Sequence, residues 1–162
     1  MKLIFIRHGQ ATAYCADDAG RNLTEFGQAQ AHETAGYVAG GHDVDLIVAS
    51  PFNRAYQTAQ ILQQTLQDKG KAVGLITLDS ITPDDDPNQG LNDLDDLLQA
   101  QNIGDDACVA VVCHMPIVAR MVSVLTALPP IPFDLAGVAV LETPVIAPDL
   151  AQEITRFAPK QP

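Results

Sequence analysis

The sequence predicts an α/β fold, a three-layer sandwich in which helices flank a mostly parallel sheet. Three observations predict it. Short apolar runs rich in β-branched residues recur along the chain, helix-like segments separate them, and three of the runs end in polar residues. Right-handed crossovers would bring the carboxyl ends of such strands to one edge of the sheet. The chain has 162 residues, the size of one ordinary domain, so we expect a single domain over residues 1–162.

The expected elements alternate along the chain. Thr24 is a good N-cap for the first helix, Gly40 and Gly41 are expected to stop it, and Ser50 with Pro51 predicts the start of the second helix. An acidic, proline-bearing loop is expected over residues 79–90. Strands are expected over residues 3–6, 46–49, 73–78, 107–113, 137–141 and 153–157, and helices over residues 25–38, 52–67, 91–101 and 117–125.

Composition limits the classes of function. The formal net charge of −11 argues against nucleic-acid binding, which needs a basic face, and against docking on anionic membranes. Three cysteines without a pattern predict free thiols and a reducing compartment, and no segment has the form of a signal peptide or a membrane span. We therefore expect a cytoplasmic protein. The sequence leaves its oligomeric state open.

The polar residues that follow the strands predict the functional site. Arg7 and His8 directly follow the first strand, Arg54 lies in the first turn of the helix after the second strand, and His114 follows the strand at 107–113. In open α/β sheets, ligands bind outside the carboxyl ends of the strands. We expect these four side chains to meet at one edge of the sheet.

Two histidines and several arginines suit a phosphoryl group. Guanidinium groups bind phosphate oxygens in pairs, and three of the five arginines, Arg7, Arg21 and Arg54, lie beside strand ends or in the first loop. A neutral His8 could attack phosphorus in line, become phosphorylated and be regenerated by water. Its other ring nitrogen would need a fixed acceptor, and a backbone carbonyl near Gly9 could provide it.

Other chemistries fit the sequence less well. A zinc site around Cys113, His114 and His8 would lack the usual ligand spacing. A thiol nucleophile at Cys113 would lie inside an apolar strand, where core packing is the more ordinary role. No glycine-rich phosphate loop occurs, which argues against a nucleotide cofactor.

Four motifs in order resemble the histidine phosphatase, or phosphoglycerate mutase-like, superfamily. These are Arg-His-Gly at residues 7–9, Arg-x-Leu-Thr-x-x-Gly at residues 21–27, the second arginine motif at residues 50–59 and Cys-His-Met-Pro at residues 113–116. The resemblance extends over about residues 1–125. Within the superfamily the chain is most similar to the short SixA-type phosphohistidine phosphatases, because it shares the second arginine motif and a Thr-Pro pair at residues 82–83 and has no long lid insertion.

The resemblance implies a phosphoglycerate mutase-like fold and a site without cofactor or metal. His8 would be the phosphorylated nucleophile, Arg7, Arg54 and His114 would form the phosphate pocket, and Arg21 would lie near its mouth. The expected partner is a phosphorylated protein that carries phosphohistidine, or a small phosphate ester. The alternatives are a small-molecule phosphomonoesterase of the same superfamily and a non-catalytic phosphate-binding module.

One departure from the superfamily concerns the proton donor. Many members that act on phosphate monoesters carry an acidic residue after the third strand, and here that loop has Asp84 and Asp86 but no glutamate. An alcohol leaving group needs a proton from such an acid, whereas a phosphorylated imidazole leaves more easily. The two aspartates are therefore either possible proton donors or part of a solvated acidic loop.

Overall fold

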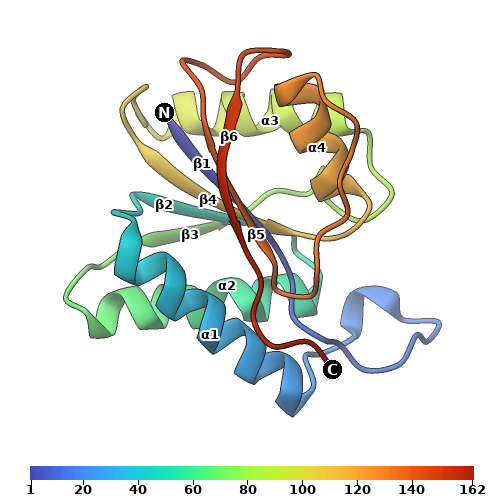
Figure 1. Ribbon diagram of the computed structural model, residues 1–162. Coiled ribbons are helices and arrows are strands. Elements are labelled where there is room, and N and C mark those ends of the chain that lie inside the picture. The colour runs from blue at the N-terminus through green and yellow to red at the C-terminus, as the bar shows by residue number, and fades with distance from the viewer.

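The computed structural model describes all of residues 1–162 and has one six-stranded sheet with the order β3-β2-β4-β1-β5-β6 (Figure 1). Four strands are parallel neighbours, and β5 runs antiparallel to both β1 and β6. The strands are β1 (Lys2–Arg7), β2 (Leu46–Ala49), β3 (Gly74–Thr77), β4 (Cys108–Cys113), β5 (Val138–Glu142) and β6 (Gln152–Phe157). The helices are α1 (Glu25–Gly41), α2 (Asn53–Asp68), α3 (Pro87–Ala100) and α4 (Ile117–Thr126), with a short 3-10 helix η1 (Asp18–Gly20).

Helices cover both faces of the sheet, which confirms the predicted three-layer α/β sandwich. Helices α1 and α2 lie on one face and α3 and α4 on the other (Figure 1). The central strand β1 is buried on both sides: Leu3 and Phe5 belong to the core under α3 and α4, and Ile4 and Ile6 to the core under α1 and α2. Successive side chains of a strand point to opposite faces, so a strand between two helical layers must be apolar throughout.

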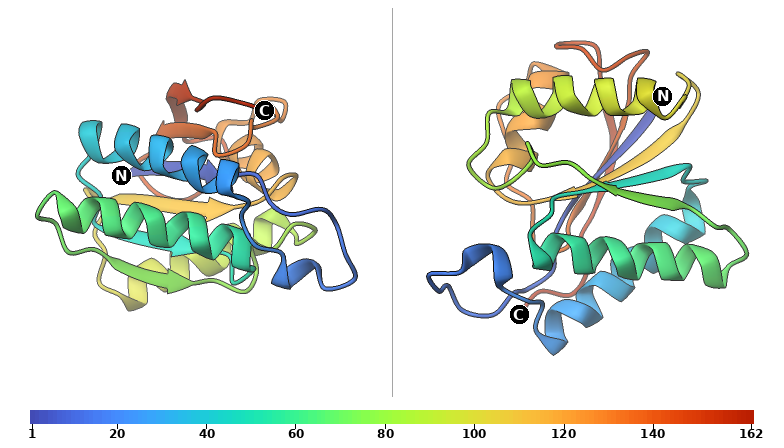
Figure 2. Two further views of the ribbon diagram at one scale, coloured as in Figure 1. Left: turned by 90° about the horizontal axis from the view of Figure 1, so that it is seen from below. Right: turned by 180° about the vertical axis from the view of Figure 1, so that it is seen from behind.

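The register of the sheet brings the expected strand ends together. Arg7 at the end of β1 pairs with Cys113 at the end of β4, and Ala49 at the end of β2 pairs with Val112. Because β5 is antiparallel, its first residue, Val138, lies at this same edge. The predicted convergence of the three polar endings is therefore confirmed. The segment between β1 and α1 extends past this edge of the sheet (Figure 2).

Several boundaries differ from the predicted ones. Helix α3 begins at Pro87, because Asp86 accepts a hydrogen bond from the main-chain N–H of Asn88 as its N-cap. The N-cap of α2 is Phe52, so the prediction that Ser50 caps this helix was wrong. Helix α1 continues through both glycines that were expected to stop it. None of the helices has the length and apolarity that a membrane crossing requires.

Candidate functional site

His8 lies at the first position after β1, and its imidazole is held in one orientation. Its main-chain N–H donates to the carbonyl of Cys113 at 3.0 Å, which continues the β1–β4 ladder. Its Nδ1 lies 2.6 Å from the carbonyl oxygen of Gly9. A carbonyl only accepts, so Nδ1 carries the proton. Burial, with smaller contributions from Arg54 and Arg7, lowers the pKa of His8 to about 3, so the ring is neutral near pH 7 and Nε2 has a free electron pair.

Arg54 faces this free nitrogen. It lies in the first turn of α2, and its Nε donates to Nε2 of His8 at 3.2 Å. The guanidinium is buried, with its side chain 5% exposed. Burial lowers the pKa of Arg54, and the carboxylate of Asp18 opposes this effect. The arrangement places a fixed cation directly beside the unprotonated nitrogen of His8.

His114 is the second imidazole of the site. It follows β4, and its ring lies edge-on to His8, with 5.1 Å between the ring centroids. Its Nε2 shares a hydrogen bond of 2.7 Å with the hydroxyl of Ser50, and its Nδ1 is buried without a partner. Burial is the main cause that lowers the pKa of His114 to about 2, followed by the charges of His8 and of the neighbouring arginines. The site therefore contains two neutral imidazoles.

Arg7, the last residue of β1, contacts the segment that precedes β5. One of its terminal nitrogens, Nη1, donates to the carbonyl of Phe133 at 2.8 Å, and its Nε is buried without a hydrogen-bond partner. Burial lowers the pKa of Arg7. Buried polar groups without partners cost free energy. This site has two of them, Nε of Arg7 and Nδ1 of His114. A bound anion is a natural partner for such groups.

Close main-chain contacts hold the turn after His8. The N–H of Gly9 donates to Oγ1 of Thr58 at 3.2 Å, and that hydroxyl donates to the carbonyl of Arg54 at 2.8 Å. A Cβ added to Gly9 would lie 2.5 Å from the carbonyl oxygen of Gly27, and one added to Gly27 would lie 2.0 Å from that of Gln10. Only glycine fits at either position, so the turn after β1 packs directly against the main chain of α1.

Sequence reasoning missed the place of Asp18 in the site. Its carboxylate accepts from Nη2 of Arg54 at 3.2 Å and from Nη1 of Arg21 at 2.9 Å. These contacts, with that of Arg21 the largest cause, lower the pKa of Asp18. The residue lies in a polar stretch without periodicity, and only its place three residues before Arg21 relates it to a motif. Arg21 itself joins the site through Asp18.

Comparisons with known proteins agree with this geometry. Residues 3–75 match the family model described as the histidine phosphatase superfamily (branch 1). The amino-terminal part of this chain is thus similar to the histidine phosphatase superfamily. The match covers the Arg-His-Gly motif and both Arg21 and Arg54. No curated protein sequence matches the chain significantly.

Solved structures with the same fold include several phosphatases. The protein histidine phosphatase SixA in complex with tungstate has a TM-score of 0.81 at 23% identity, over 98% of this chain and 97% of that one. The putative phosphohistidine phosphatase SixA from Agrobacterium tumefaciens has a TM-score of 0.75 at 24% identity, over 98% and 97%. The mycobacterial glucosyl-3-phosphoglycerate phosphatase with VO3 has a TM-score of 0.67 at 19% identity, over 87% of this chain and 90% of that one. The predicted phosphoglycerate mutase-like fold is therefore confirmed.

The two possible proton donors lie after β3. Asp84 is exposed, and the carboxylate of Asp86 caps α3. Their neighbour Asp85 accepts from the main-chain and side-chain donors of Thr82 at 2.8 and 2.5 Å. The only carboxylate bonded to the guanidinium beside His8 is that of Asp18.

Cys113 precedes His114 but faces the core. It is fully buried, and burial raises the pKa of its thiol to about 12. At neutral pH the thiol is protonated and packs among apolar side chains. Its surroundings are those of a structural cysteine rather than of a reactive one.

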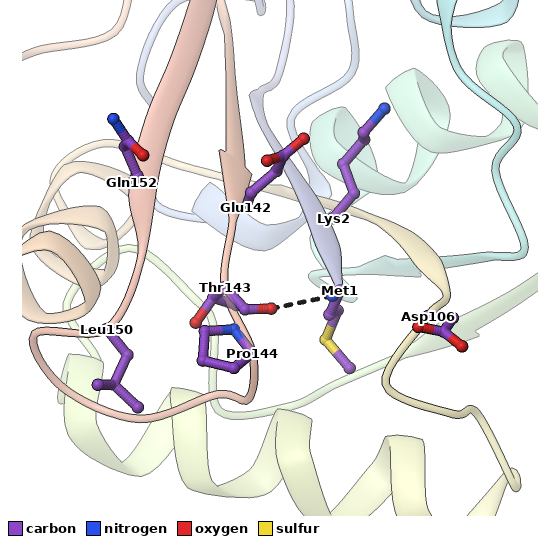
Figure 3. A pocket seen from close by; sticks show the side chains of 8 residues that line it. All are labelled: Met1, Lys2, Asp106, Glu142, Thr143, Pro144, Leu150 and Gln152. Carbon is purple, nitrogen blue, oxygen red and sulfur yellow. Dashed lines mark hydrogen bonds between the residues drawn. The ribbon is translucent and has the colours of Figure 1, made fainter.

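A separate hollow opens at the opposite edge of the sheet. It has a volume of about 500 Å³ and lies where β1 and β4 begin and β5 ends (Figure 3). The amino terminus donates to the carbonyl of Thr143 there at 2.9 Å. Its lining has charges of both signs but no histidine or arginine, and includes Met1, Lys2, Asp106, Glu142 and Gln152. It shares no residue with the site around His8.

Proposed function

We propose that this chain is a phosphatase, a single domain over residues 1–162, that removes phosphate from phosphohistidine on a protein through a phosphorylated His8. One observation carries the proposal. The Nδ1–H of the neutral ring of His8 donates a hydrogen bond to the carbonyl of Gly9, so Nε2 is the unprotonated nitrogen and lies beside Arg54. A nucleophilic imidazole needs this tautomer, and the guanidinium provides the charge that attracts a phosphoryl group.

In the first half of the proposed reaction, the phosphoryl group moves to His8. The electron pair of Nε2 attacks phosphorus, the P–N bond of the substrate breaks, and the substrate imidazole leaves with the electrons of that bond. The Nε–H of Arg54, which donates to Nε2 in the free protein, would then donate to a phosphoryl oxygen. Charge on the equatorial oxygens is stabilised by such fixed donors.

The two buried nitrogens without partners support the same assignment. Nε of Arg7 and Nδ1 of His114 are buried without partners. If the hydroxyl of Ser50 donates to Nε2 of His114, then Nδ1 carries a proton that a phosphoryl oxygen can accept. In this assignment Arg7, Arg54 and His114 bind the phosphoryl group, and Arg21 contributes through Asp18.

In the second half, water regenerates the enzyme. A water oxygen attacks phosphorus, the bond to Nε2 breaks, and the electron pair returns to the ring of His8. The water protons stay on the phosphate or pass to solvent, so the cycle ends with inorganic phosphate and a neutral imidazole. No step needs a metal or a cofactor in the proposed cycle.

The phosphohistidine substrate is supported by the acid–base state of the site. Both histidines are neutral near pH 7, and Asp18 is ionised. An alkoxide leaving group would need a proton from one of these groups, whereas an imidazole that is protonated on its second nitrogen leaves as a neutral molecule. The likeness in fold to SixA structures agrees with this choice of substrate. The free cysteines are consistent with a reducing cytoplasmic location.

The test is phosphoryl transfer by the purified protein and by His8→Asn. The asparagine amide can still donate to the carbonyl of Gly9, but it has no group at the position of Nε2. We expect turnover of a phosphohistidine peptide to fall about a thousandfold or more, and the phosphoenzyme trapped in a neutral quench to disappear. His32→Asn, on the exposed side of α1, is the matched control. Unchanged turnover in His8→Asn would contradict the assignment of the nucleophile.

Substrate class is tested separately. Wild-type protein is given a phosphohistidine peptide, a phosphoserine peptide and a sugar phosphate, and the values of kcat/KM are compared. We expect the phosphohistidine peptide to have the highest value. Higher values for the alcohol esters would overturn the substrate class and favour a phosphomonoesterase. Phosphate binding without any phosphoenzyme would favour a non-catalytic module.

A further inference from the structure

A continuous chain of polar contacts leads from the nucleophile to the surface. Arg54 uses all three of its nitrogens: Nε donates to Nε2 of His8, Nη1 to the main-chain carbonyl of Asp18 at 2.8 Å, and Nη2 to the carboxylate of Asp18. The second carboxylate oxygen of Asp18 accepts from Arg21. Arg21 is in turn fixed by its Nε, which donates to the carbonyl of Thr12 at 2.9 Å. Asp18 thus links two arginines that come from different elements.

The segment that carries Asp18 is held in place at its base and its tip. At the base, Ala11 and Leu23 form an isolated β-bridge, so residues 12–22 leave and return at one point. At the tip, the carboxylate of Asp17 accepts from the N–H of Gly20 and caps η1. Asn53 in the first turn of α2 donates to the carbonyl of Gly20 at 3.3 Å. The segment therefore has a defined position against the start of α2, close to Arg54.

We propose that Asp18 is a positioning residue that holds Arg54 with its Nε directed at Nε2 of His8. This inference rests on the proposed role of His8 as the nucleophile. An arginine side chain has many rotamers, and all but one of them must be excluded if a single N–H is to meet the reacting nitrogen. Asp18 excludes them from the side of the guanidinium that is remote from His8. Arg21 keeps the carboxylate of Asp18 in place, and this contact explains why the motif at residues 21–27 begins with an arginine.

A competing role for Asp18 makes the opposite prediction. A carboxylate on a phosphate-binding arginine could simply occupy the place of the phosphoryl group until substrate displaces it. In that case its removal would strengthen the binding of inorganic phosphate and leave kcat the same or higher. A positioning residue can also weaken anion binding through its charge, but its removal must lower kcat. The decisive quantity is therefore kcat, with phosphate affinity measured beside it.

The kinetic test uses Asp18→Ala in two backgrounds. In the wild-type background we expect kcat to fall about tenfold or more, because a misplaced group loses much of its effect on the transition state. In an Arg54→Lys background, where the guanidinium is already absent, the same change should lower kcat by less than about twofold. Asp17→Asn, which removes the neighbouring charge and keeps the cap of η1, is the control and should leave kcat unchanged. An unaltered kcat in Asp18→Ala, or losses that multiply with Arg54→Lys, would overturn the proposal.

A spectroscopic measurement separates this inference from the proposed function. The 15N signal of Nε2 of His8 reports the hydrogen bond from Arg54 whether or not the protein turns over any substrate. We expect this signal to move toward the value of a free neutral imidazole in Asp18→Ala and to stay in place in Asp17→Asn. A signal that stays in place in Asp18→Ala would contradict the positioning role even in an active enzyme. If the wild-type protein forms no phosphoenzyme, the proposed function fails, while the shift still decides the role of Asp18.

Discussion

The two buried histidines make a specific prediction about stability in acid. Burial lowers the pKa of His8 to about 3 and that of His114 to about 2, whereas an unfolded histidine titrates near pH 6.5. The unfolded chain therefore binds more protons than the folded one between these values. Stability rises with pH across this interval, is fully present above about pH 6.5, and is lost as the pH falls toward 3.

The magnitude follows from the proton binding of the unfolded state. At about pH 5, an unfolded histidine is stabilised by protonation by roughly 2 kcal/mol, and a folded histidine with a pKa near 3 gains almost nothing. Each of the two histidines should therefore lower the free energy of unfolding by about 2 kcal/mol between about pH 7.5 and pH 5, and together by about 4 kcal/mol. Measurement at pH 5 separates this effect from that of Asp18, because the lowered pKa of Asp18 stabilises the fold and this stabilisation is lost only in stronger acid.

Urea denaturation of wild-type protein and His114→Gln at the two pH values tests this reasoning. The glutamine amide can keep a hydrogen bond to Ser50 and does not take up a proton in acid. The variant is expected to be less stable at neutral pH, but to lose about 2 kcal/mol less than the wild type on acidification. His32→Gln, at an exposed position on α1, is the control for a general effect of removing a histidine. An equal loss in wild type and His114→Gln would refute the assignment of a buried neutral imidazole.

Two further predictions concern the turn beside the site and the loop after β3. Gly27→Ala would place a Cβ 2.0 Å from the carbonyl oxygen of Gln10, and we expect thermal unfolding to show a loss of about 3 kcal/mol or more. In the same helix, Gly36→Ala meets no atom within 4 Å and should instead stabilise by about 0.5–1 kcal/mol. Asp86→Asn keeps an oxygen that caps α3, so Tm and the hydrolysis of a phosphohistidine peptide should both change little. A tenfold loss of hydrolysis with unchanged Tm would instead identify Asp86 as a proton donor.

The fold could be predicted because its main signals are local and repeated. β1 must be apolar on both faces because α-helices lie on both sides of it. Its run of four apolar residues therefore predicts a strand buried between two helical layers. Parallel connections then fix where each strand ends. The meeting of Arg7, His8, Arg54 and His114 follows from topology alone, without knowledge of any contact.

The details of the site depend on contacts that no local pattern records. Ser50 before Pro51 has the form of an N-cap, but its hydroxyl bonds to His114 from a neighbouring strand, and α2 begins at Asn53. Asp18 lies in a segment without periodicity, so only the folded path of residues 12–22 brings it to Arg54. The start of α3, by contrast, has a local signal. Asp86 is an N-cap and Pro87 the first helical residue, but both lie in the acidic segment that the sequence predicts to be a loop.

The acid–base state of the site bears on the question of which group supplies the proton. A leaving alcohol requires a group that is protonated at neutral pH and can reach the leaving oxygen. Neither imidazole meets the first condition, and the two hydrogen-bonded arginines keep Asp18 ionised. The proposed phosphohistidine substrate needs no such group, since its second ring nitrogen can carry the proton into the site. Under this proposal the proton belongs to the substrate, and the enzyme provides a bare nitrogen and a fixed cation. The rate of the first half-reaction should then follow the protonation of the substrate imidazole, falling as the pH rises above the pKa of that ring.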